Sequence, residues 1–191
     1  MMHETYRITE NTTNPAPLGL AGFGMSTLLL NLHNAGLFGM DTMILAMGIF
    51  FGGIAQILVG KMEWKKNNMF GLVAFSSYGF FWITLVFLML LPKLGLGEAP
   101  SAISMGWFLT AWGIFSVGLF IATFRMTMVM RVLFGSVVAL FFLLAAADFT
   151  GFAPLKTTAG LVGIFSGCLA LFISLSMVIN DTHGREVVRL R

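Results

Sequence analysis

The residues of this chain that could do chemistry are the polar side chains lying within long apolar runs. Tyr78 lies near the middle of Met69–Leu91, a run without Lys, Arg, Asp or Glu, so its hydroxyl needs a hydrogen-bond partner. Trp82 follows four residues later and therefore shares its helical face. We expect this face either to line a pathway for a small solute or to form a helix interface.

Neutral polar side chains also enter the other apolar runs. Most serine and threonine hydroxyls in a helix simply bond to a carbonyl of that helix, which is the simpler interpretation for many of them. The candidates for hydrogen bonds to a small, weakly hydrated solute, besides Trp82, are Thr27, Asn31, Gln56, Ser77 and Ser136.

Charged groups are missing from the middle of every apolar run. A carrier with a side-chain proton relay usually contains a buried carboxylate or histidine, and His33, at the end of the first run, is expected at the interface instead. His3 and His183 also lie outside the run centres, and Cys168 is the single cysteine. Neither a nucleophile with its base nor a cluster of metal ligands is found. The chain is therefore predicted not to be an enzyme, and no cofactor or metal is expected.

The segment Asn14–Leu20 reads NPAPLGL and precedes the first apolar run. Asn14 can cap a helix, and Pro15 suits the first helical position because its missing N–H would have no partner there. One interpretation is a rigid helix start. The other is an anion site at the mouth of a pore, facing the positive end of the helix, although two prolines remove two donors. Pro15, Leu18 and Gly19 therefore join Asn14 as candidate binding residues.

The elements that must position these residues are transmembrane helices. The chain is 58% hydrophobic and 10% charged, too apolar for one soluble core. An apolar run of about 18 residues or more is typical of a transmembrane helix, since a helix satisfies its own backbone in hydrocarbon. The fold class predicted is an all-α integral membrane protein with six spans: Leu18–His33, Thr42–Gly60, Met69–Leu91, Ser101–Phe124, Met128–Ala147 and Thr157–Ile179.

Basic residues predict the orientation of these spans. Of the eleven Lys and Arg residues, only Lys93 and Lys156 fall on one side of the predicted membrane. The positive-inside rule then places both termini in the cytoplasm, with residues 1–17 as a cytoplasmic segment, 18–179 as the transport domain and 180–191 as a cytoplasmic tail. The net charge of +3 reflects these loops rather than a nucleic-acid partner. The N-terminus lacks the features of a cleaved signal peptide. A multi-pass protein of the inner or plasma membrane is expected.

Small residues recur one helical turn apart within the spans. Gly48 and Gly52 form one such pair, and Gly163 and Gly167 form another. These pairs allow close approach of helix backbones, within one chain or between copies, and packing within the chain is favoured.

Several motifs of this chain match those of a known family, namely Asn14–Leu20 followed by Gly22–Gly24, Asn31–Asn34, Gly48–Gln56 and Ala74–Trp82. In these motifs the chain resembles the acetate uptake transporters, also called succinate–acetate permeases. This resemblance implies a six-helix protomer with cytoplasmic termini in a lipid bilayer. It also implies a homohexamer in which each protomer has its own pathway for acetate and, in some members, succinate.

The resemblance further implies a hydrophobic constriction in the middle of that pathway. Its members correspond to Phe23, Tyr78 and Val137 of this chain, with Asn14 near an anion site. The family has a leucine at the third position, so the smaller valine indicates a wider gate and a weaker preference for acetate over larger acids.

Three functions fit the sequence. The first is transport of small monocarboxylates, by a channel or a proton-linked carrier. The second is a pore for another small polar solute, such as ammonium or an amide. The third is a structural or assembly protein of the membrane whose glycine faces only mediate packing.

Overall fold

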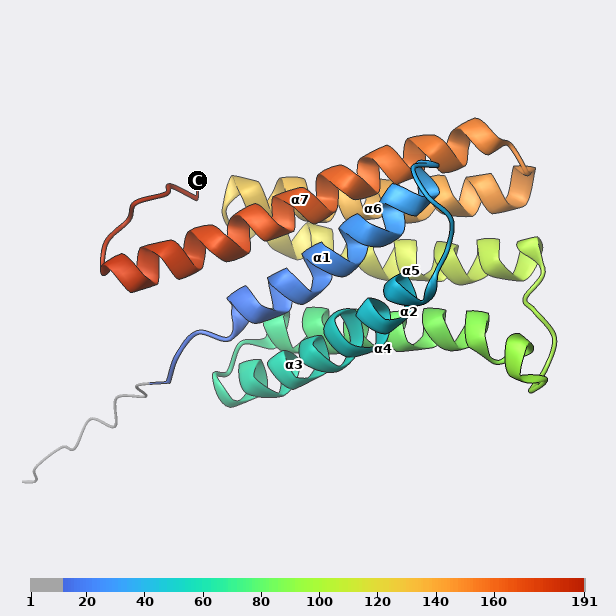
Figure 1. Ribbon diagram of the computed structural model, residues 1–191. Coiled ribbons are helices and arrows are strands. Elements are labelled where there is room, and N and C mark those ends of the chain that lie inside the picture. The colour runs from blue at the N-terminus through green and yellow to red at the C-terminus, as the bar shows by residue number, and fades with distance from the viewer. Residues whose placement is uncertain (1–11, 191) are drawn as a thin grey trace, which may run out of the picture.

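The computed structural model describes residues 12–190, and this part of the chain is helical without a strand. Six long helices lie side by side in one bundle, the second being continuous through α2, η1 and α3 (Figure 1). The elements are α1 Ala16–Asn34, α2 Thr42–Met47, η1 Gly48–Ala55, α3 Gln56–Lys65, α4 Met69–Leu90, η2 Pro92–Leu94, α5 Ala102–Ala122, η3 Thr123–Arg125, α6 Met128–Thr150 and α7 Ala153–His183.

Five of these helices are long and apolar enough to cross a membrane. They are Thr42–Lys65, Met69–Leu94, Ala102–Arg125, Met128–Thr150 and Ala153–His183. The remaining helix, α1, has 19 residues and is not among the five, since its glycines, asparagines and histidine dilute its apolar content. The all-helical class is confirmed, while six crossings stay a prediction.

The start of α1 differs by one residue from the sequence-based expectation. Pro15 is the N-cap and Pro17 lies in the first turn, whereas Asn14 was expected to cap the helix and Pro15 to open it. The Asn14 side chain still serves the helix start, because its Oδ1 accepts a hydrogen bond from Ala16 N–H at 3.0 Å. Pro15 and Pro17, on either side of Ala16, leave few N–H groups here for an Asn to cap.

Several helices extend beyond their apolar runs. The second helix continues to Lys65, α6 continues to Thr150, and α7 spans Ala153–His183. A helix needs only its own backbone hydrogen bonds to continue past the hydrocarbon layer, and polar side chains at its ends reach the interface. The apolar pattern therefore located these helices and underestimated their lengths.

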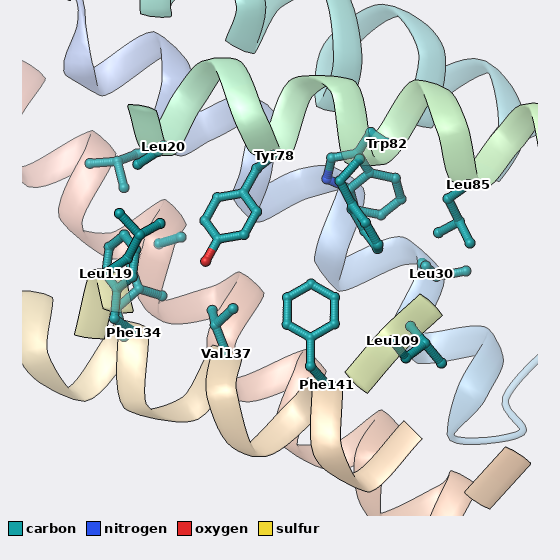
Figure 2. Close-up of a cluster of buried hydrophobic side chains, with 14 of the residues drawn as sticks. Leu20, Leu30, Tyr78, Trp82, Leu85, Leu109, Leu119, Phe134, Val137 and Phe141 are labelled. Carbon is teal, nitrogen blue, oxygen red and sulfur yellow. The ribbon is translucent and has the colours of Figure 1, made fainter. Parts of the chain in front are cut away.

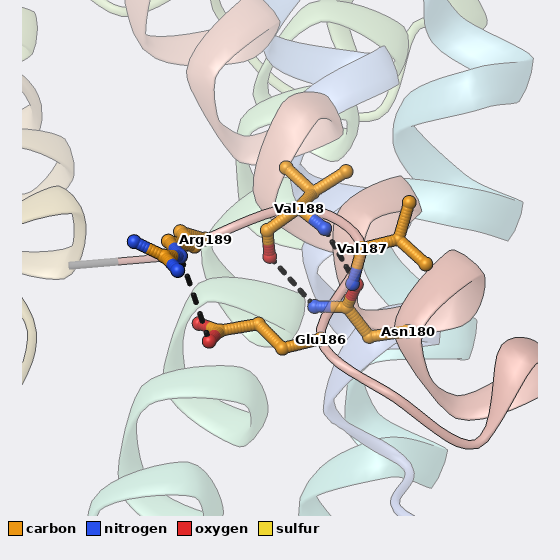
Figure 3. A network of polar contacts seen from close by, with 5 residues as sticks. All are labelled: Asn180, Glu186, Val187, Val188 and Arg189. Carbon is orange, nitrogen blue, oxygen red and sulfur yellow. Dashed lines mark hydrogen bonds and ion pairs between the residues drawn. The ribbon is translucent and has the colours of Figure 1, made fainter.

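Both ends of the described chain lie at the same end of the bundle (Figure 1). At the C-terminus, the Oδ1 of Asn180 accepts hydrogen bonds from the N–H groups of Val187 and Val188, both at 2.8 Å. Its Nδ2 donates to the carbonyl of Val188 at 2.7 Å, and Arg189 lies 4.0 Å from Glu186 (Figure 3). The tail is thereby folded back on α7. Of the predicted terminal segments, residues 1–11 and 191 lie outside the described residues.

The contact between α1 and α7 is a close one. A Cβ added to Gly167 would lie 2.8 Å from the carbonyl oxygen of Gly24, and one added to Gly163 would meet the Asn31 side chain. The Oγ of Ser174 donates to the Pro17 carbonyl at 2.6 Å, which joins the same two helices. The small residues predicted to allow close packing therefore pack within the chain.

The middle of the second helix is a π-helix over Gly48–Ala55. Such wide turns are rare in α-helices and are often found at functional sites. Gly48 and Gly52 face the Trp82 ring of α4, and a Cβ at Gly52 would lie 2.8 Å from it. The sequence predicts a transmembrane helix over Thr42–Gly60 without such a wide turn, because apolar periodicity does not distinguish a π-helix from an α-helix over eight residues.

Candidate functional site

Two cavities lie end to end inside the helix bundle. The Asn31 cavity has a volume of about 170 Å³ and is lined by residues of α1, α4, α5, α6 and α7. The Gln56 cavity has about 30 Å³ and is lined by Leu20, Phe23, Gln56, Phe70, Ala74, Phe75, Tyr78, Met130, Leu133, Phe134 and Val137. Space for one water needs about 10–15 Å³, so the first cavity has room for a small solute with water and the second has room for little more than water.

Three side chains line both cavities and form their shared wall. They are Phe23 of α1, Tyr78 of α4 and Val137 of α6. Tyr78 and Val137 are 4% and 2% exposed, so the wall lies deep in the protein. The ring centres of Phe23 and Tyr78 lie 5.8 Å apart. The shared wall is therefore a thin partition of two aromatic rings and one branched aliphatic side chain.

Tyr78 is at the centre of an aromatic cluster. Figure 2 shows its side chain extending from α4 toward Val137 and Phe141 of α6. Its hydroxyl lies 2.9 Å from Ser116 Oγ, and Ser116 Oγ donates to the Trp112 carbonyl at 2.7 Å. Because a serine hydroxyl has one hydrogen, Tyr78 is the donor in the first bond. The buried hydroxyl is satisfied, as its position in the apolar run required.

One side of the Asn31 cavity carries a polar strip from α1. Thr27 and Asn31 line it, and both are 2% exposed. Asn31 Nδ2 donates to the Thr27 carbonyl at 2.8 Å, and Asn34 Nδ2 donates to Asn31 Oδ1 at 3.1 Å. Trp82 lines the same cavity from α4. Most of the remaining wall is apolar, so a solute with one polar end and one methyl end fits its chemistry.

The end of the Asn31 cavity lies near the connection from α1 to α2. His33 lines it there, and its Nδ1 lies 2.9 Å from the Phe38 carbonyl. The histidine is therefore at the end of the helix, as the sequence predicted, and is held by the loop that follows.

Gln56 supplies the polar group of the smaller cavity. It is fully buried, and its Nε2 donates to the Gly52 carbonyl at 2.6 Å, within the π segment. Its Oε1 has no hydrogen-bond partner among the described residues. A buried amide oxygen without a partner is costly unless water or a solute binds it, so this atom is free to accept a hydrogen bond in the cavity.

An open groove follows the Gln56 cavity toward the end of the bundle that holds both termini. This terminal groove includes Asn14, Asn68 and Arg125, and it shares Leu20, Phe70, Phe75 and Met130 with the Gln56 cavity. The groove, the Gln56 cavity, the shared wall and the Asn31 cavity thus follow one another along the bundle.

The structure brings some predicted residues together and leaves others apart. Phe23, Thr27, Asn31, Tyr78, Trp82 and Val137 line the Asn31 cavity; Gln56 lines the smaller cavity, and Asn14 the groove. Five others line none of these three spaces, namely Pro15, Leu18, Gly19, Ser77 and Ser136. Gly19 packs on the Phe75 ring, and Ser136 accepts a hydrogen bond from Ser166 Oγ at 2.8 Å, so these two join helices.

Sequence reasoning missed four residues of this region. Ser116 escaped notice because nothing local marks it as the partner of Tyr78. Asp148 and Lys156 line the Asn31 cavity, but both fell just outside the predicted spans. Glu63 lies beyond the end of the predicted span Thr42–Gly60, yet it is 2% exposed and accepts a hydrogen bond from Asn68 Nδ2 at 2.7 Å.

The chain has clear relatives among known proteins. It matches the model of the GPR1/FUN34/yaaH family over residues 3–188. It is 50% identical over 175 residues to the "Succinate-acetate/proton symporter SatP" of Escherichia coli (strain K12), covering 92% of this chain and 93% of that protein. A solved structure described as the bacterial acetate channel SatP is 49% identical, with a TM-score of 0.93 over 95% of this chain and 100% of the other.

A more distant relative carries a different description. The "Ammonia transport outward protein 2" of Saccharomyces cerevisiae is 30% identical over 167 residues. The match covers 83% of this chain and 59% of the yeast protein.

Proposed function

This chain belongs to the GPR1/FUN34/yaaH family, and we propose that it moves small carboxylates such as acetate across the inner membrane. The observation that supports this most is the row of two cavities and one groove within a single chain, interrupted by one thin wall. The volume and mixed polarity of the Asn31 cavity suit a solute with one carboxylate and one methyl group. The names and descriptions of the relatives point to the same substrate class.

In this proposal Phe23, Tyr78 and Val137 form the constriction. They are the side chains that line both cavities, so a solute must displace or pass them. Asn14, at the opposite end of the pathway, lines the groove where the predicted anion site would lie. α1 completes the protomer as a sixth transmembrane helix, with both termini in the cytoplasm and six protomers assembled, as the resemblance implies.

Two routes of passage are consistent with the cavities. Acetate is ionised at neutral pH because carboxyl groups titrate near ~4. The anion either crosses alone, with hydroxyls and amides such as Asn31 and Gln56 replacing water, or crosses together with a proton. Either route needs no buried lysine or arginine at the wall.

Uptake of labelled acetate into proteoliposomes tests the proposal. One set is given an imposed voltage and another an imposed pH gradient, with protein-free liposomes alongside because acetic acid leaks through lipid. Uptake that follows voltage alone indicates passage of the anion. Uptake that follows only the pH gradient indicates electroneutral passage with a proton. If neither exceeds the protein-free control, the proposal fails and an assembly role takes its place.

Ammonia is the second candidate substrate, because a relative at 30% identity is described as an ammonia exporter. The unpartnered Gln56 oxygen offers an acceptor for an N–H donor in the smaller cavity. Ammonium salts that reduce acetate uptake at constant pH would support a shared pathway.

A further inference from the structure

Two charged side chains stand in the wall of the Asn31 cavity. Among the described residues that line it, Asp148 is the only acidic residue and Lys156 the only Lys or Arg. Asp148 lies near the end of α6 and Lys156 lies in the first turns of α7, so the two come from consecutive helices that pack together. Asp148 is half-buried, whereas Lys156 is exposed to solvent. The two charges are thus placed differently with respect to water.

This difference in exposure has an electrostatic consequence. Water and salt weaken the field of the exposed Lys156 more than that of the half-buried Asp148. An arriving carboxylate can form an ion pair with Lys156, and this pair neutralises the positive charge that Lys156 contributes to the cavity. A second carboxylate on the same solute would then face Asp148 alone, with an apolar wall beyond it that cannot replace its water shell.

We propose that Asp148 makes this cavity select monocarboxylates against dicarboxylates, with Lys156 holding the single carboxylate. The inference rests on the proposed function, since the two charges act only on a solute that passes through the cavity. It adds a substrate preference based on charge, which is separate from size selection at the wall of Phe23, Tyr78 and Val137. Succinate is then a poor substrate of this chain and acetate a good one.

The test compares labelled acetate and labelled succinate in proteoliposomes, as the ratio of their initial uptake rates. Asp148→Asn removes the charge at nearly constant shape. We expect the succinate-to-acetate ratio to rise roughly fivefold, which corresponds to about 1 kcal/mol. Lys156→Met should instead raise the KM for acetate several-fold, while Lys156→Arg should restore it. A solute passes the Asn31 cavity in either direction of transport. The ratio of uptake rates is therefore not obscured when the protein is inserted into the liposomes in both orientations.

Two matched variants separate charge from structure. Asp148→Glu keeps the charge and should retain the low wild-type ratio. Glu98→Gln removes an exposed acidic residue that does not line the cavity. Glu98 belongs to the connection between α4 and α5, which lies at the same end of the bundle as the connection between α6 and α7 (Figure 1). Glu98→Gln should leave the ratio unchanged.

The outcomes distinguish this inference from the proposed function. Wild-type protein that takes up no acetate overturns the proposed function, and this inference with it. Acetate uptake with a succinate ratio that Asp148→Asn leaves unchanged overturns the inference alone. If Asp148→Asn does not elute as the wild-type protein does, the wild-type ratio is measured at about 0.01 M and about 0.15 M salt, where the Debye length falls from about 30 to about 8 Å. A ratio that rises with salt supports the charge filter, and a constant ratio contradicts it.

Discussion

The Tyr78 side chain has two structural roles, one for its ring and one for its hydroxyl. Its ring forms part of the wall between the cavities, and its hydroxyl joins α4 to α5 through Ser116. The sequence marked Tyr78 as unusual because a tyrosine in the middle of a span lacks the headgroups that usually bind its hydroxyl. The sequence alone does not identify Ser116, because it lies 38 residues from Tyr78 and only the packing of α4 against α5 brings the two hydroxyls together.

Removing either ring of the wall should open it. With Tyr78→Ala or Phe23→Ala, the two cavities become continuous, so uptake of a bulkier monocarboxylate such as butyrate should increase about tenfold relative to acetate; such a factor needs a barrier change of only about 1.4 kcal/mol. The initial uptake rates of labelled butyrate and labelled acetate into proteoliposomes measure this ratio. Tyr78→Phe keeps the ring and should retain the wild-type preference. Wild-type selectivity in both alanine variants would show that the wall is not the constriction.

At the scale of helices, the bounds of α4 were predicted to within one residue. Asn68 precedes the apolar run, and its side chain accepts a hydrogen bond from Gly71 N–H at 3.1 Å, which fixes the start. The ends of α6 and α7 were predicted too short, because Asp148 and Lys156 resemble loop residues when only hydropathy is considered. The two charges of the proposed filter were missed for that reason. The π segment was missed because apolar periodicity does not distinguish a π-helix from an α-helix over eight residues.

The close contact of α1 with α7 should make Gly167 intolerant of a side chain. Gly167→Ala places a Cβ 2.7 Å from the backbone nitrogen of Leu28, and overpacking of this kind costs about 1–3 kcal/mol. We expect the Tm of the detergent-purified protein to fall by roughly 2–10 °C. Gly118→Ala is the matched control, since its added Cβ meets no atom within 4 Å beyond the backbone of its own helix turn, and alanine favours a helix by about 0.5–1 kcal/mol. Equal Tm values for the two variants would refute this packing argument.

At the scale of the whole molecule, the charge pattern and the fold agree on one point. Both ends of the described chain lie at one end of the bundle (Figure 1), as an even number of crossings requires. The sequence predicted this from the unequal distribution of Lys and Arg over the loops. Which end of the bundle faces the cytoplasm depends on the membrane and its insertion machinery. The distribution of charges predicts this orientation, and an experiment in cells tests it.

Cysteine labelling in intact cells tests that orientation. Cys168→Ser removes the single cysteine, and Glu98→Cys or Lys65→Cys then introduces one at either end of the bundle. A membrane-impermeant maleimide should label Glu98→Cys in intact cells and label Lys65→Cys only after permeabilisation. The reverse pattern would invert the assignment of the cytoplasmic side.

The two cavities and their shared wall are lined by side chains of one chain. This arrangement determines whether a mutation in one gene copy is recessive or dominant. When defective and intact copies assemble together, each intact copy keeps a complete conduit, so total flux should decline in simple proportion to the dose of the defective allele. Lesions at Phe23, Tyr78 or Val137 should therefore be recessive. If copies assemble as proposed, substitutions on the outer helix surfaces through which they would meet should instead be dominant, because one faulty subunit would disturb its neighbours.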